Sequence, residues 1–153
     1  MAHPIRNRAL IIAILGALAT ISPFAIDMYL PAFPGIALAL HTSTAKISLS
    51  ISSYFAGLAV GQVFYGPLLD RYGRKRPLYA GLVLFVVASV LCMGSRTAEW
   101  LVAMRFLQAL GACAAQVAGM ATVRDFFPVQ ETAKIISLLI LILGVSPLLA
   151  PTD

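Results

Sequence analysis

Long apolar segments alternate with short polar ones along almost the whole chain. Each apolar segment is close to the roughly 20 residues that a helix needs to cross the hydrocarbon core of a bilayer. The alternating ten-residue segments of a membrane β-barrel do not occur. The pattern therefore predicts an all-α membrane protein with five spanning helices, at about residues 9–30, 47–69, 77–95, 100–123 and 134–152.

Composition excludes an ordinary soluble domain. The 153 residues are 60% hydrophobic and 11% charged, whereas soluble domains carry about 25% charged residues. So few charged side chains cannot cover a soluble surface of this size. The first apolar segment follows Arg6 and Arg8 and continues to Leu30 without a clean small-residue cleavage site, which favours a retained helix over a secretory signal peptide.

Positive charge is distributed unevenly among the polar segments. If the N-terminus is cytoplasmic, only Lys46 and Arg96 fall outside the cell, and eight basic residues fall inside: Arg6, Arg8, Arg71, Arg74, Lys75, Arg76, Arg124 and Lys134. Basic loops tend to stay in the cytoplasm. We therefore expect a multi-pass protein of the cytoplasmic (inner) membrane with a cytoplasmic N-terminus. The same bias explains the net charge of +5 without nucleic-acid binding.

Two charged side chains, Asp27 and Arg105, lie inside predicted spans. Charged residues at membrane depth are rare, and each is by default a candidate for function. Both fall in the outer part of their helices, so opposite charges at similar depth suggest an ion pair. On this interpretation Asp27 binds a proton or a charged substrate, and Arg105 tunes its proton affinity and gates proton release. A purely structural clamp is the alternative.

Other polar side chains share helical faces with these two residues. Gln108 and Gln116 lie on the stripe of Arg105, and Thr20 lies on that of Asp27. With Tyr54 of the second span, they are weaker candidates for the wall of a substrate cavity.

Small residues and cysteines indicate packing. Gly57 and Gly61, and likewise Gly111, Ala115 and Gly119, have the spacing that lets helices approach closely in lipid; we expect contacts within the chain, with dimerisation as the alternative. Cys92 and Cys113 have no neighbouring ligands that would make a metal site. Neither a GxxxxGK[ST] phosphate loop nor a nucleophile–base pair is present, so we expect no enzyme and an ion gradient as the source of energy.

The segment between the second and third spans reads GPLLDRYGRKR at residues 66–76. It resembles the signature loop of the major facilitator superfamily, in which Gly66 is followed by Asp70 and Arg71 and then by Gly73, Arg74 and Lys75. Asp70 ends a helix where the helix dipole disfavours a carboxylate, so we expect Arg71 or Arg74 to compensate it. Gly73 permits a tight turn. The resemblance implies a conformational latch against the other half of a transporter; topology and attraction to anionic lipid are the alternative.

Three further segments resemble the drug/proton antiporters of the bicyclomycin-resistance (Bcr/CflA) group. They are IDMYLP at 26–31, RFLQALG at 105–111 and GVSPLLAP at 144–151. The last contains Gly144, Pro147 and Pro151, and departs from the general antiporter motif, which has Gly-Pro and then paired glycines. Proline bends a spanning helix and frees backbone carbonyls, so we expect a tight, flexible contact with the other half here; a simple kink is the alternative.

The resemblance implies a twelve-helix transporter of two six-helix halves. Residues 1–153 would supply the first five helices of the N-terminal half. The implied activity is multidrug efflux: small hydrophobic or cationic drugs exported by alternating access, with the proton gradient as energy source and no cofactor or metal. Sites in such folds lie between the halves, so we expect the chain alone to be inactive and to need the missing C-terminal half, with membrane lipid as its other partner. A non-transporting interaction or assembly fragment and a nutrient importer of the same superfamily are the alternatives.

Overall fold

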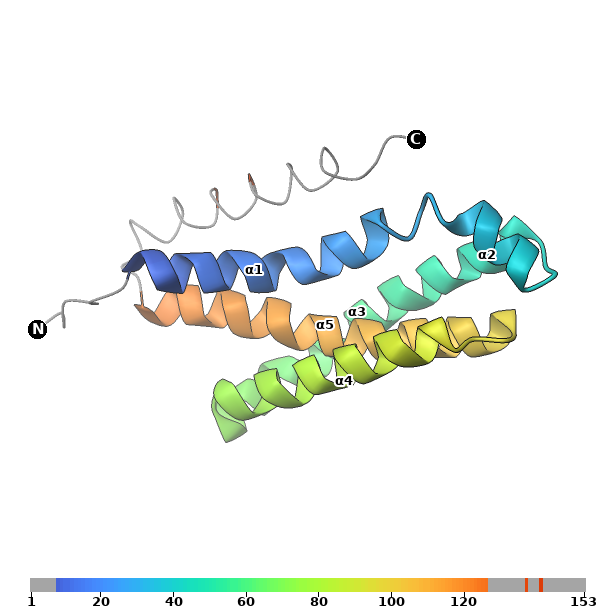
Figure 1. Ribbon diagram of the computed structural model, residues 1–153. Coiled ribbons are helices and arrows are strands. Elements are labelled where there is room, and N and C mark those ends of the chain that lie inside the picture. The colour runs from blue at the N-terminus through green and yellow to red at the C-terminus, as the bar shows by residue number, and fades with distance from the viewer. Residues whose placement is uncertain (1–7, 127–136, 138–140, 142–153) are drawn as a thin grey trace, which may run out of the picture.

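The computed structural model describes residues 8–126, together with residues 137 and 141. The regular secondary structure in this part of the chain is helical, and its long helices run lengthwise in an elongated bundle (Figure 1). The helices are α1 (Arg8–Asp27), α2 (Phe33–Ala39), α3 (Thr44–Tyr72), α4 (Lys75–Met93) and α5 (Ala98–Phe126). The predicted span at 134–152 falls outside the described residues, apart from positions 137 and 141.

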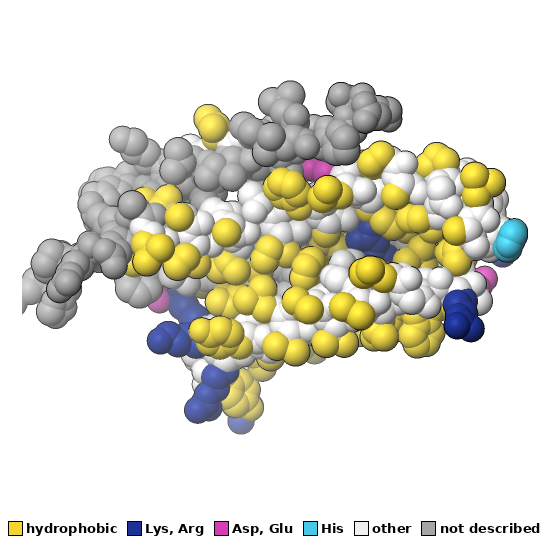
Figure 2. Space-filling view, viewed as in Figure 1, with side chains coloured by type: hydrophobic (Ala, Val, Ile, Leu, Met, Phe, Trp, Pro, Cys, Tyr) yellow, Lys and Arg dark blue, Asp and Glu magenta, His cyan; other side chains and the backbone are white. Residues whose placement is uncertain are grey.

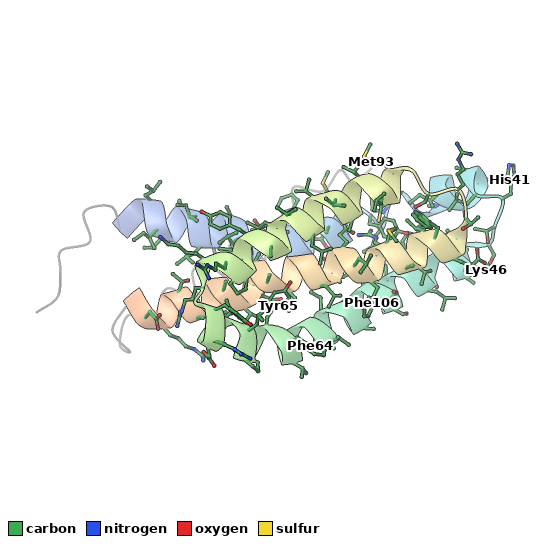
Figure 3. The ribbon with its side chains drawn as sticks, turned by 90° about the horizontal axis from the view of Figure 1, so that it is seen from below. His41, Lys46, Phe64, Tyr65, Met93 and Phe106 are labelled. Carbon is green, nitrogen blue, oxygen red and sulfur yellow. The ribbon has the colours of Figure 1, made fainter. Side chains whose placement is uncertain are left out.

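Four of these helices are long and apolar enough to cross a membrane: Leu10–Asp27, Thr44–Tyr72, Lys75–Met93 and Ala98–Asp125. Large apolar side chains cover much of their outer surface (Figure 2). Val63 and Phe64 on α3, for example, are 71% and 69% exposed, and Phe64 points away from the bundle (Figure 3). An apolar exterior of this kind is stable where lipid replaces water. The fold is therefore an all-α membrane bundle, as the sequence predicts.

The two ends of the bundle differ in charge. Lys and Arg side chains gather mainly at one end (Figure 2), where Arg71, Arg74, Lys75 and Arg76 join α3 to α4 and Arg124 lies near the end of α5. We refer to this as the basic end. The opposite end, which α2 caps, is the α2 end.

The short helix α2 is absent from the sequence prediction, which treats residues 31–46 as a loop. Seven residues are too few to establish a periodic pattern, and Pro31 and Pro34 on either side of its start are typical of turns. Proline also suits the first turn of a helix, because the amide hydrogen it lacks would have no partner there. Ala37 is buried against Ile47 of α3 and Leu101 of α5, and this contact holds α2 across the end of the bundle.

α5 forms the centre of the bundle and packs most extensively against α3 and α4. Small side chains make the close approach possible. A Cβ atom at Gly57 of α3 would lie 2.6 Å from the carbonyl oxygen of Phe106, and one at Gly61 would lie 2.8 Å from the Cβ of Cys113. On the other side of α5, a Cβ at Gly111 would lie 2.5 Å from the backbone nitrogen of Phe85 in α4. The glycine faces are thus used within the chain, as expected from their spacing.

We expect Gly111→Ala to destabilise the bundle by about 1–3 kcal/mol, the usual cost of overpacking a core. The added methyl group would meet backbone atoms of α4, which no side-chain rotation can move. Gly66→Ala is the matched control, because a Cβ there meets nothing within 4 Å and alanine is the better helix former. Thermal unfolding of the purified protein in detergent measures both. Equal melting temperatures for the two variants would contradict the close contact between α4 and α5.

Candidate functional site

Arg105 of α5 is the centre of a buried polar network. Its side chain is 5% exposed. The Nη1 atom donates to the carbonyl oxygen of Ala25 at 3.1 Å and to Oε1 of Gln108 at 2.8 Å. The guanidinium carbon lies 3.5 Å from the centre of the Tyr29 ring and 5.5 Å from that of Tyr54. The positive charge is therefore solvated by neutral groups, namely a carbonyl dipole, an amide and two aromatic faces.

Gln108 links this charge to α4. Its Nε2 donates to Oγ of Ser89 at 2.7 Å, and the Ser89 hydroxyl donates to the carbonyl oxygen of Phe85 at 2.6 Å. The amide is therefore oriented at both ends: its oxygen accepts from Arg105 and its nitrogen donates to a serine. A chain of hydrogen bonds with this polarity runs from α5 into the backbone of α4.

Serine hydroxyls hold the two tyrosine rings in place. Tyr54 is buried, and its Oη donates to Oγ of Ser22 on α1 at 3.2 Å. Tyr29 Oη and Ser50 Oγ lie 2.7 Å apart. Because the single Ser50 hydroxyl hydrogen is donated to the carbonyl oxygen of Ile47 at 2.5 Å, Tyr29 must be the donor to Ser50. The network thus connects α1, α3, α4 and α5.

Arg105 and Gln108 line a cavity of about 460 Å³ near the α2 end. The cavity lies among α1, α2, α4 and α5, and sulfur-containing and apolar side chains form most of its wall. Within the described part of the chain, Arg105 is its one charged lining residue. The full set is Ala25, Met28, Tyr29, Ile36, Ala39, Leu40, Cys92, Met93, Ser95, Leu101, Arg105 and Gln108.

The contacts described for Arg105 do not include the expected ion pair with Asp27. Lys46–Glu99 and Arg74–Asp125 are ion pairs of the described residues, and neither involves Arg105. The physical reason lies at the end of α1. The amide of Tyr29 donates to Ile26 rather than to Ala25, so the Ala25 carbonyl is available to accept from Arg105. The guanidinium thus meets the negative end of the α1 dipole instead of a carboxylate.

The remaining cavity candidates are divided between different places. Tyr54 contacts Arg105 as described, whereas the Thr20 hydroxyl donates to the Ala17 carbonyl of its own helix at 2.9 Å. Gln116 is exposed and lines a second cavity, near the basic end. Eleven residues separate it from Arg105, which corresponds to about 16 Å along a helix. The helical face that Arg105 and Gln116 share therefore lines two separate cavities.

The second cavity, of about 410 Å³, lies between α3 and α5. Gly66 and Asp70 of the signature loop line it together with Gln116 and Arg124. The loop that connects α3 to α4 turns at Gly73, whose φ of +74° favours glycine.

Arginines of the signature loop have partners that the sequence did not indicate. Arg74 was a candidate to compensate Asp70, but its Nη2 lies 2.6 Å from Oδ2 of Asp125 on α5. The guanidinium of Arg71 lies 5.5 Å from the centre of the Tyr72 ring. Lys75 begins α4 and is exposed. The segment expected to contact the other half of the transporter, with Gly144, Pro147 and Pro151, lies outside the described residues.

Sequence reasoning missed the residues that hold the site together. Ser22, Ser50 and Ser89 lie within apolar segments, and Tyr29 lies at the end of the first predicted span. A usable signal was present, because a hydroxyl group buried in a spanning helix needs a hydrogen-bond partner. Serines inside a span therefore mark positions that face another helix or a polar side chain.

Comparison with known proteins agrees with this architecture. Residues 12–152 match the profile of the Major Facilitator Superfamily. The chain is 42% identical over 146 residues to the "Uncharacterized MFS-type transporter YdgK" of Bacillus subtilis (strain 168). The aligned segment covers 95% of this chain and 36% of that protein. It is also 42% identical over 135 residues to the "Multidrug resistance protein MdtL" of Escherichia coli (strain K12 / DH10B), covering 88% of this chain and 34% of the relative.

The chain thus spans about a third of the length of these curated relatives. The match nevertheless extends over nearly all of this chain, and the relatives are transporters rather than enzymes. The chain belongs to the major facilitator superfamily of membrane transporters.

Proposed function

We propose that this sequence is the N-terminal part of a longer exporter that expels small drugs in exchange for protons. The observation that carries the proposal is the buried Arg105 network beside a cavity of drug-like size. The 42% identity to proteins named for multidrug resistance supports export of drugs. The segments at 26–31, 105–111 and 144–151 support assignment to the Bcr/CflA group and to antiport.

The proposed proton coupling depends on two alternative partners for Arg105, the Ala25 carbonyl and the Asp27 carboxylate. A carboxylate binds a guanidinium more strongly than a backbone carbonyl does, because both groups are charged. Asp27 lies two residues beyond Ala25, at the end of α1. A rotation of this last turn exchanges the Ala25 carbonyl for the Asp27 carboxylate when Asp27 loses its proton. Protonation of Asp27 returns Arg105 to the carbonyl, so the proton sets the position of the end of α1.

The signature loop acts at the other end of the same helices. We assign the basic end to the cytoplasmic side of the inner membrane, in accordance with the distribution of Lys and Arg. The ion pair of Arg74 with Asp125 joins the loop to α5. Asp70 lines the cavity at this end and is the residue that we assign to the latch with the C-terminal half.

Cysteine labelling tests the orientation. In a variant without Cys92 and Cys113, we expect a membrane-impermeant maleimide to label His41→Cys at the α2 end in intact cells. Tyr72→Cys at the basic end should react only after the membrane is permeabilised. Neither substitution removes a Lys or Arg from the loops that set the topology. The reverse labelling pattern would refute the assignment of the basic end to the cytoplasm.

Asp27→Asn in the full-length transporter should abolish proton release from everted membrane vesicles when drug is added, while the protein is inserted at the normal level. The asparagine amide does not ionise near neutral pH and so cannot take up and release the coupling proton. Asp27→Glu keeps a carboxyl group and should retain part of the activity. The uncharged compounds N-phenyl-1-naphthylamine and dansylamide serve as test compounds. Loss of the inserted protein in both variants would indicate a packing role for Asp27 and would contradict proton coupling.

Expression of residues 1–153 alone should give membrane insertion but no drug-dependent proton release. Co-expression of the remaining part of the transporter as a separate polypeptide should restore activity, because substrate sites in this fold lie between two halves. Export by the 153-residue chain without that partner would contradict the division of labour proposed here.

A further inference from the structure

We infer that the cavity beside Arg105 selects apolar compounds that carry an uncharged or anionic hydrogen-bond acceptor and rejects cations. This inference rests on the proposed function, because it names the class of compound that the same site takes. It narrows the substrate expectation from the sequence, which includes cationic drugs.

The charge of the cavity wall supports the inference. Arg105 is the one charged lining residue in the described part of the chain, and the side chain of Asp27 does not line the cavity. The groups that contact the guanidinium are the Ala25 carbonyl, the Gln108 amide and two tyrosine rings. These groups are neutral and leave a net positive charge at the wall. In a site of low dielectric constant this charge repels a second cation strongly.

The hydrogen-bond donors of Arg105 supply the attraction. A guanidinium has five N–H donors, and both hydrogen bonds to described residues use Nη1. With respect to the described residues, Nε and Nη2 are therefore the donors that a ligand would use. The N–H bonds lie in the plane of the guanidinium, and Tyr29 covers one face of that plane at 3.5 Å, so an acceptor must approach along its edge. A carbonyl, sulfonyl or carboxylate oxygen in that position accepts a charge-assisted hydrogen bond.

The rest of the wall indicates an adaptable site for one small molecule. Met28, Cys92 and Met93 contribute polarizable sulfur atoms to the lining, and unbranched methionine side chains adjust to ligands of different shape. A volume of about 460 Å³ falls in the range of about 300–1,000 Å³ that is typical of small-molecule sites. Such a wall selects by size and polarity, while Arg105 selects by charge.

Three dansyl compounds that share one fluorophore test the selection by charge. They are dansylamide, which is uncharged, dansylglycine, which is an anion, and dansylcholine, which is a cation. We expect the full-length transporter in phosphatidylcholine nanodiscs to bind the first two at least about tenfold more tightly than dansylcholine, because all three share the sulfonyl acceptor and only dansylcholine brings a second cation close to Arg105. Fluorescence titration measures the affinities, and nanodiscs without protein give the correction for partitioning into lipid.

Substitutions at Arg105 connect this preference to one side chain. Arg105→Gln should remove the difference between dansylglycine and dansylcholine, whereas Arg105→Lys should retain their order. Arg96→Gln is the matched control, because Arg96 is an exposed cation of the same end of the bundle that does not line the cavity. It should leave all three affinities unchanged.

A second measurement needs no change at Arg105. In a Cys113→Ala background, N-ethylmaleimide should alkylate Cys92, which is partly exposed and lines the cavity. Dansylamide should slow this reaction, and dansylcholine at the same concentration should not. Equal protection by both compounds, or no protection by either, overturns the inference whether or not the Arg105 variants fold.

The drug-dependent proton release described above separates this inference from the proposed function. If the transporter exports drugs but binds dansylcholine as tightly as dansylamide, the selection by charge is wrong and export stands. If the three compounds bind in the expected order and no drug triggers proton release, the binding site stands and the proposed antiport is wrong.

Discussion

A single positive charge buried in an apolar bundle is the constraint on which the candidate site depends. A guanidinium at this depth must find polar partners inside the protein, because lipid supplies none. Arg105 takes one from the end of α1 and reaches α4 through Gln108 and Ser89. Aromatic faces from Tyr29 and Tyr54 complete its surroundings. The relative positions of four spanning helices thus depend on the solvation of one side chain.

Close helix packing makes this solvation possible. Hydrogen bonds act only over about 3 Å, so α5 must lie near its neighbours before Gln108 can reach α4. Gly57 and Gly61 bring α3 close to α5, and Gly111 does the same for α4. The apolar packing and the polar network are therefore two parts of one arrangement: the first sets the distances that the second requires.

The sequence predicted the helical class and the glycine contacts because both depend on local patterns of residue type. It did not predict the partners of Arg105. Pairing Asp27 with Arg105 treats side-chain charges as the only partners, whereas the turn after α1 frees a backbone carbonyl that no pattern of residue types reveals. The ion pair of Arg74 with Asp125 was missed for a related reason, since it joins segments whose proximity depends on the packing of α5. Helix α2 was too short to give a periodic signal.

The contacts at Gly57 and Gly111 also determine which helices are able to move. The close backbone approach at these glycines opposes sliding of α3 or α4 along α5, because a shift would bring larger side chains into the space that only glycine leaves open. α1 meets α5 differently: Leu15 packs on Val123 through larger side chains, and even an added Cβ at Gly119 would lie 4.0 Å from Leu15. Side chains of this kind can repack without backbone collision. The α1 rotation proposed above would therefore take place against a frame made of α3, α4 and α5.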